Sequence, residues 1–165
     1  MKVFGIDPGS TRTGYGCIET DGNRHQLAVC GAVATSPRSS FPEKLLAIHQ
    51  TLRRLLAEQQ PECVAVEDVF YAKNVRTTVV LGHARGVVLL AGQQAGVDIH
   101  EYPPAEIKKS VTGSGAATKE QVQFMVTKLL RLKSAPQPAD ASDGVAAALA
   151  CVLRADVMRA IAAAR

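Results

Sequence analysis

Two short apolar runs in this chain each meet an acidic residue, and this is the feature that most constrains the fold. Asp7 ends the first run, residues 3–6, and is followed at once by Pro8-Gly9-Ser10. Glu67 adjoins the second run, residues 63–66. An ionised carboxylate is costly in apolar surroundings unless a positive group compensates it, and neither run supplies a Lys or Arg beside its acid. We therefore expect two buried strands whose acidic ends belong to a functional site.

A second acidic pair, Asp140 and Asp143, stands at the start of an alanine-rich stretch. On a helix this spacing places both side chains on one face, with Cβ atoms about 5–6 Å apart, where the helix dipole favours negative charge. Three of the acids also have an ordinary structural explanation, because a first-turn Asp caps a helix and Asp7 before Pro-Gly suits a turn. Glu67, in a strand this apolar, has few such explanations. Side-chain alternation alone leaves open whether Glu67 or Asp68 faces the site. Taken together, the carboxylates predict a site for Mg²⁺ or Mn²⁺.

The composition fits a soluble globular protein, and the distribution of its basic residues, more than its net charge, favours a polyanionic partner. The 165 residues are 47% hydrophobic and 21% charged, and their formal net charge is +4. This length is enough for one domain, which we expect to cover residues 1–165. No apolar stretch approaches the ~20 residues that span a bilayer. The four cysteines form no CxxC pair and no signal peptide is visible, so we expect the cytoplasm. Residues 103–133 carry six Lys or Arg against two Glu, which favours nucleic-acid binding, although any single lysine is also ordinary solvated surface.

The periodicity of apolar residues predicts the order of strands and helices. Strands are expected at residues 2–6, 15–20, 25–35, 63–69 and 98–102. Helices are expected to begin near residues 42, 79, 104, 118 and 139. Polar residues 71–78 are interpreted as a loop. Three meander strands followed by helices that alternate with two more strands indicate one α/β domain with a five-stranded mixed sheet flanked by helices.

The expected chemistry is hydrolysis of a phosphodiester. Four carboxylates can hold two divalent ions about 3.5–4 Å apart, one directing a water at phosphorus and the other stabilising the leaving 3′ oxygen. Basic segments would then position the phosphates. Phe70 opens the polar loop in a chain with only 4% aromatic residues, where it either stacks on an unpaired base or closes the core. Lys73 and Asn74 in the same loop suit contacts to DNA.

Ordered blocks of sequence carry a family resemblance. They read GIDPGS (5–10), TGYG (13–16), EDVFYAKN (67–74), LGHARG (81–86), KEQVQ (119–123) and ADASD (139–143). In this order and at this spacing they resemble the RuvC family of bacterial Holliday junction resolvases. The resemblance implies a ribonuclease H-like fold, a homodimer and Mg²⁺-dependent paired symmetric nicking of four-way DNA junctions, with Mn²⁺ as a substitute ion. It also implies a role in homologous recombination and DNA repair beside the RuvA–RuvB branch-migration complex.

The resemblance further implies roles for individual residues. It assigns the metal carboxylates to Asp7, Glu67, Asp140 and Asp143, and so selects Glu67 over Asp68. It places Phe70 at the junction point. The expected DNA-contacting set, with Lys119 also near the scissile phosphate as a catalytic residue, is Phe70, Lys73, Asn74, Arg76, Lys108, Lys109 and Lys119. The chain departs from the family pattern at Asp68, which adds charge next to the site, and at Val75-Arg76.

Two other functions compete with the nuclease. An Asp-x-Gly loop after a first strand also occurs in actin-like kinases and ATPases, but this chain shows no second loop of that kind. A branched-DNA binder without catalysis would have no use for four carboxylates near phosphate. A two-fold junction suits a two-fold dimer, and the expected helix at residues 79–95, which carries Gly82 and Gly86, is our candidate interface.

Overall fold

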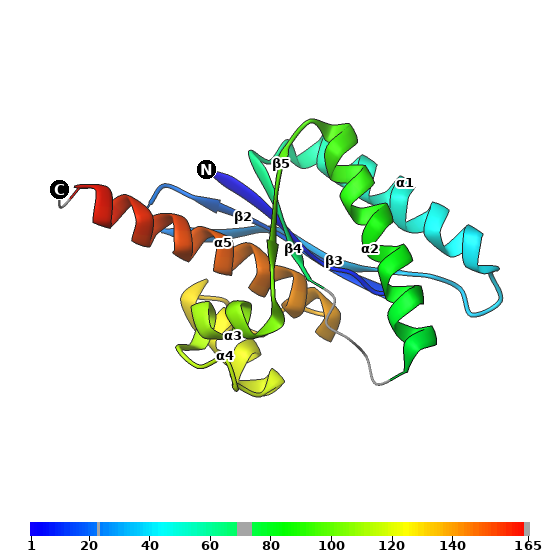
Figure 1. The fold of residues 1–165 in the computed structure, drawn as a ribbon. Helices are drawn as coiled ribbons and strands as arrows, with labels where there is room; N and C mark the ends of the chain where they lie inside the picture. Colours follow the sequence, from blue (N-terminus) through cyan, green and yellow to red (C-terminus); the bar gives the residue numbers. More distant parts are fainter. Residues whose placement is uncertain (23, 69–73, 164–165) are drawn as a thin grey trace.

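The computed structural model describes residues 1–22, 24–68 and 74–163. Its centre is a five-stranded sheet of order β3-β2-β1-β4-β5 (Figure 1). The strands are β1 Lys2–Asp7, β2 Arg12–Thr20, β3 His25–Ala34, β4 Cys63–Glu67 and β5 Asp98–Tyr102. β1, β2 and β3 form an antiparallel meander, while β4 runs parallel to β1 and β5 parallel to β4. The mixed five-stranded sheet expected from the sequence is therefore confirmed.

Helices cover both faces of this sheet. α1 (Phe41–Gln59) and α2 (Val75–Ala95) lie on one face, and α5 (Ala139–Ala163), with the short helices α3 (Pro104–Thr112) and α4 (Lys119–Leu129), lies on the other (Figure 1). Each face has its own buried cluster of apolar side chains. Across the part of the chain that the structure describes, no helix has the length and apolarity to cross a membrane.

The alternation of side chains along β1 and β4 decides on which face of the sheet Asp7 and Glu67 lie. In β1, Phe4 and Ile6 pack with the α1–α2 cluster, whereas Val3 packs with the α5 cluster. Because strand side chains alternate, Asp7 falls on the face of Val3, the α5 face. The same alternation in β4 puts Cys63 on the α5 face, and with it Glu67.

α5 lies close against β1 and β2 because glycines line the contact. A Cβ atom at Gly5 would collide with the backbone of Gly144 and Ala148, and one at Gly14 with the Asp140 carbonyl. A larger residue at either position would hold the first turns of α5 away from the sheet. These glycines therefore set the depth at which the acidic start of α5 meets Asp7.

Two helix starts match the sequence signals and one does not. Capping boxes occur at Ser40–Glu43 and at Thr118–Gln121, and α1 and α4 begin within one residue of their expected starts near residues 42 and 118. The expected loop at residues 71–78 is wrong from residue 75 onward, because α2 begins at Val75 rather than near residue 79. The physical reason is the Asn74 cap, whose side-chain oxygen accepts the Arg76 N–H at 2.9 Å. The strand expected at residues 63–69 ends at Glu67; Val69 lies outside the described residues.

Candidate active site

Carboxylates from three elements meet at one edge of the sheet. β1 and β4 are parallel neighbours, so Asp7 and Glu67, the last residues of these strands, reach the same edge. α5 begins beside them and brings Asp143. These three side chains line a hollow of about 280 Å³ together with Pro104, Ile107, Lys108, Lys119, Val122 and Ala146. Asp140 does not line the hollow, but its charge acts on Asp7 and Asp143.

Burial and crowding make the central carboxylates hard to ionise. The pKa of Asp7 rises from 3.8 to about 7, first because the group is buried and then because Asp143 repels its charge. The pKa of Glu67 rises from 4.5 to about 8, again by burial and then by repulsion from Asp7 and Asp143. A nearby cation lowers such pKa values. The site therefore favours positive charge in the space between these side chains.

Lys119 already supplies one positive charge from the protein itself. It is the first residue of α4, and its Nζ lies 2.6 Å from Oδ2 of Asp143. Burial raises the pKa of Asp143, and the hydrogen bond from Lys119 acts against that rise. The same hydrogen bond raises the pKa of Lys119. The ammonium group is half exposed at the rim of the hollow, where it can also reach an incoming phosphate.

Arg12 is a site residue that the sequence analysis missed. Arg12 is the first residue of β2. Its Nη1 atom lies 3.6 Å from Oδ2 of Asp140. The side chain is 53% exposed, so its charge is available to other groups as well. A signal was present, since Arg12 stands between the GIDPGS and TGYG blocks that flank Asp7. It was overlooked because nothing local connects Arg12 to an acid 128 positions away.

The carboxylates of Asp7, Glu67 and Asp143 are ligands that suit a hard divalent ion, although they do not converge on a single metal position. Among the residues that the structure describes, no three His, Cys, Asp or Glu side chains come together as a ready set of metal ligands. The acids that line the hollow offer oxygen donors only, the chemistry that Mg²⁺ and Mn²⁺ prefer. Their mutual repulsion, seen in the raised pKa values of Asp7 and Glu67, is what a cation would relieve.

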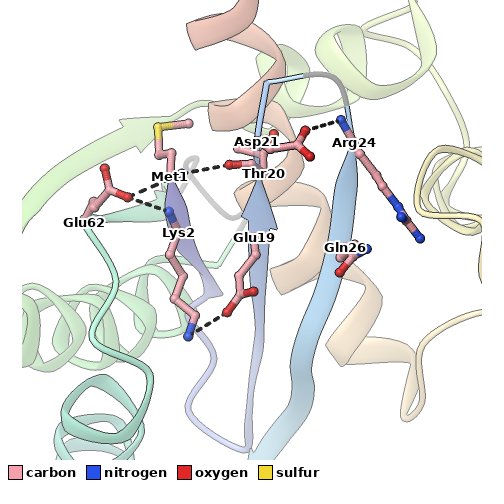
Figure 2. A pocket seen from close by; sticks show the side chains of 8 residues that line it. All are labelled: Met1, Lys2, Glu19, Thr20, Asp21, Arg24, Gln26 and Glu62. Atoms are coloured by element: carbon pink, nitrogen blue, oxygen red, sulfur yellow. Dashed lines mark hydrogen bonds and ion pairs between the residues drawn. The ribbon is translucent and has the colours of Figure 1, made fainter.

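A second hollow lies at the opposite end of β1 and is of a different kind. Figure 2 shows its lining, where Lys2 reaches Glu19 and Glu62 lies beside Met1, while the Arg24 side chain points away. Lys2 Nζ lies 2.9 Å from Glu19, and Asp21 accepts the Arg24 backbone N–H at 2.9 Å. Because acids and bases are mixed here, this hollow lacks the one-sided negative charge of the Asp7 site.

Comparison with known proteins identifies the family. The family described as Crossover junction endodeoxyribonuclease RuvC matches residues 3–151. The protein of that name from Salinispora arenicola is 46% identical over 165 residues, covering 99% of this chain and 94% of the relative. The one from Pelodictyon phaeoclathratiforme is 43% identical over 93% of this chain and 81% of its own length. This chain belongs to the RuvC family. The family's name describes DNA-cleaving hydrolases, so the expected enzyme class is confirmed.

Solved RuvC structures share the fold. A structure of Thermus thermophilus RuvC superposes with a TM-score of 0.88 at 36% identity, covering 96% of this chain and 97% of the other. T. thermophilus RuvC in complex with Holliday junction substrate gives a TM-score of 0.90 at 36% identity, with 96% of each chain covered. The ribonuclease H-like fold that the resemblance implied is thereby confirmed.

The departure from the RuvC pattern at Asp68 has a local explanation. Asp68 directly follows β4, and its backbone N–H donates to the Tyr102 carbonyl at 2.8 Å. Its carboxylate lies 3.2 Å from Nη2 of Arg85, which also pairs with Glu101. Arg85 belongs to α2, on the face of the sheet opposite α5. The extra negative charge of Asp68 is thus paired with Arg85 on that face, and the Asp68 side chain does not line the hollow.

The structure brings only some of the predicted DNA-contacting residues to this RuvC site. Lys108 lines the hollow beside Lys119, and its charge acts on Glu67. Lys109, next on α3, is exposed and does not line it. Asn74 and Arg76 are exposed at the start of α2. The two remaining residues, Phe70 and Lys73, lie outside the described residues.

Proposed function

We propose that this chain is an endonuclease that resolves four-way DNA junctions by paired, symmetric nicks. The observation that carries this proposal is the convergence of Asp7, Glu67 and Asp143 in one hollow that Lys108 and Lys119 also line. Acids at the centre suit hydrolysis of a phosphodiester, and bases at the rim suit the phosphates of its substrate. Membership of the RuvC family supports the junction as substrate, since a 36% identical relative was solved with a Holliday junction.

The cofactor in this proposal is Mg²⁺, with Mn²⁺ as a substitute. Two ions would be held by Asp7 and Glu67 from the sheet and by Asp140 and Asp143 from α5. When bound, the ions supply an activated water and stabilise the leaving 3′ oxygen. Asp7 and Glu67 are hard to ionise without a cation, and a cation nearby would favour their ionised form.

The bases of the protein position the DNA. Lys119 lies 2.6 Å from Asp143, so it is placed to move between this acid and the scissile phosphate. Lys108 approaches the same hollow from α3. The wider contact surface that we propose adds Asn74, Arg76 and Lys109, together with Phe70 and Lys73. In this proposal Phe70 stacks on a base at the junction point.

A homodimer would place two such sites on a two-fold junction, and α2 offers the face for it. An apolar groove runs along this helix, lined by Leu45, Val79, Gly82, His83, Gly86, Val87 and Leu90. Val79 and Leu90 are 51% and 50% exposed. Cβ atoms built at Gly82 and Gly86 meet no atom within 4 Å, so a second chain can approach the helix backbone closely.

The cellular setting of this proposal follows the resemblance to the family. We place the enzyme in the cytoplasm, in homologous recombination and DNA repair, beside the RuvA–RuvB branch-migration complex. We also propose that residues 1–165 act as one nuclease domain, because both apolar clusters pack on the same sheet.

The test is cleavage of a synthetic four-way junction by the purified protein. With Mg²⁺ we expect nicks at symmetric positions in two opposing strands, and with chelator none. A linear duplex of the same sequence should stay intact. Asp7→Asn should lose cleavage by about 10³-fold or more while binding the junction with an affinity within a few-fold of wild type. Full cleavage by Asp7→Asn in Mg²⁺, or equal cleavage of duplex and junction, would reject the proposal.

A further inference from the structure

Two cysteines from distant parts of the chain lie side by side in the core under α5. Cys63 is the first residue of β4 and Cys151 lies in α5. Their sulfur atoms are 3.9 Å apart, and the two residues are 7% and 6% exposed. Bonded sulfurs are about 2 Å apart, so roughly 2 Å of further approach would close a bond. We propose that these two thiols form a disulfide when a peroxide reaches them, a modification site that joins β4 to α5.

The surroundings of the pair give its two sulfurs unequal character. The Cys63 thiol hydrogen bonds to Cys151, which is the main reason that the pKa of Cys151 falls from 9.0 to about 6. The Tyr102 hydroxyl also lowers the pKa of Cys151, while the pKa of Cys63 is raised. Cys151 is therefore the sulfur that attacks an oxidant, and Cys63 is the thiol that resolves it.

The chemistry needs one molecule of hydrogen peroxide and nothing else. The Cys151 thiolate attacks a peroxide oxygen, the O–O bond breaks, and Cys151 sulfenic acid and hydroxide form. The hydroxide takes the proton of Cys63 and becomes water. The Cys63 thiolate then attacks the sulfur of Cys151, the S–O bond breaks, and the departing hydroxide is protonated to a second water. Two thiols are oxidised by two electrons, and one peroxide is reduced to two waters.

The bond would staple two elements that carry acids of the site. β4 ends at Glu67, and α5 carries Asp143 two turns before Cys151. Cys63 lies at the opposite end of β4 from Glu67. Closing a loop of 88 residues restricts the unfolded chain strongly. We therefore expect the oxidised protein to be more stable, with its fold unchanged.

The experiment treats the full chain with hydrogen peroxide and maps its thiols by mass spectrometry. We expect a loss of about 2 Da and a linked peptide that contains Cys63 and Cys151. The melting temperature should rise by about 5–10 °C without reductant and return after dithiothreitol. Cys17→Ser with Cys30→Ser should keep both effects. Cys63→Ser should lose both, and Cys151 should then stop at sulfenic or sulfinic acid.

Three results would overturn the inference. One is oxidation of Cys17 or Cys30 while the pair stays reduced. Another is sulfinic acid on Cys151 of the wild-type chain with no linked peptide. The third is a linked peptide with an unchanged melting temperature. The mapping uses the wild-type chain, so it does not depend on how the variants fold, and junction cleavage plays no part in the readout.

Discussion

At the scale of single residues, the site gathers carboxylates whose ionisation is made unfavourable by burial and by their mutual repulsion. Asp7 and Glu67 are both buried and both repelled by Asp143, and each is hard to ionise for these two reasons. Lys119 offsets part of the repulsion from one side and Arg12 meets Asp140 on another. The protein thus carries a cluster that costs stability until cations arrive, as expected of groups kept for chemistry.

The unfavourable ionisation of Asp7 in the folded protein predicts that the stability difference between wild type and Asp7→Asn depends on pH. Asp7 has a pKa of 3.8 as a model group and about 7 in the fold, so folding favours its protonated form. That stabilisation is complete below about pH 4 and is lost as the pH rises through about 7. Asn cannot ionise. Without divalent ions, Asp7→Asn should therefore melt above wild type by an amount that grows from pH 5 to pH 8 and reaches about 5–10 °C.

The measurement is a series of thermal melts in chelator across that pH range. Asp98→Asn serves as a control, since Asp98 is an exposed carboxylate at the start of β5, and its difference from wild type should stay flat. A difference for Asp7→Asn that is also flat, or that shrinks as the pH rises, would contradict the assignment of a buried and repelled carboxylate.

Lys119 is predicted to act on the reacting phosphate more than on affinity. Its Nζ atom lies against Asp143 at the hollow, so Lys119→Ala removes a positive charge from the place where negative charge would develop on the phosphate during cleavage. Loss of one such stabilising group typically lowers the rate by about 10²–10³-fold. We expect single-turnover cleavage to fall by about 10²-fold and the dissociation constant for the junction to change by less than about threefold. Lys128→Ala, exposed near the other end of α4, should cut at the wild-type rate. Parallel losses of binding and cutting in Lys119→Ala would count against this role.

At the scale of elements, the contact of α5 with β1 and β2 builds the site, and α2 presents the remaining apolar surface. The first contact depends on glycines such as Gly5 and Gly14, which let helix and sheet backbones meet. The glycines on the α2 surface differ, because a Cβ atom built at Gly82 or Gly86 would contact no other part of the same chain. Glycine in a helix interior is unfavourable, so its presence on an exposed apolar groove suggests a partner that approaches closely.

The proposed dimer face on α2 can be tested with two matched substitutions. Leu90 lines the groove and is 50% exposed, while Leu46 on α1 is 54% exposed and does not line it. A buried unpaired charge is costly, so Leu90→Asp should shift the protein from twice the chain mass to the chain mass in sedimentation. Leu46→Asp should remain a dimer. Replacement of Gly86 by Trp should also weaken association, and an unchanged sedimentation of both α2 variants would argue against this face.

At the scale of the whole molecule, the parallel pairing of β1 with β4 and the position of α5 determine what the protein can bind. Residues 7, 67 and 143 come together only because these three elements end or begin at one edge of the sheet. The opposite edge, around Lys2 and Glu19, has mixed charges (Figure 2). The hollow at the Asp7 end of β1 therefore combines three carboxylates with Lys108 and Lys119 in its lining.

Binding of Mg²⁺ at this hollow should stabilise the whole fold. A ligand that binds only the folded state raises the melting temperature, and relief of repulsion adds to the effect. At pH 8 we expect about 10 mM Mg²⁺ to raise the melting temperature of wild type by about 2–5 °C, and to raise that of Asp7→Asn by much less. Equal shifts in the two proteins, measured at constant ionic strength, would place the ion elsewhere.

Local sequence patterns predicted the order of strands and helices and proposed the acids of the candidate site, although the choice of Glu67 over Asp68 depended on the family resemblance. The apolar runs before Asp7 and Glu67 identified two buried strands, and the box at Thr118–Gln121 identified the start of α4. These signals depend on neighbours a few positions apart, so they can be recognised without a fold. The expected start of α2 near residue 79 was wrong, because the helix begins at the Asn74 cap, within residues interpreted as a polar loop.

Contacts between distant elements were decided by the tertiary structure alone. Arg12 meets Asp140, Asp68 turns to Arg85, and Cys63 comes within 3.9 Å of Cys151. No spacing along the chain predicts these pairs, because each depends on how closely α5 or α2 packs against the sheet. The amino-acid sequence by itself therefore determined the family and the acidic residues of the candidate site, and packing determined which charges and thiols surround them.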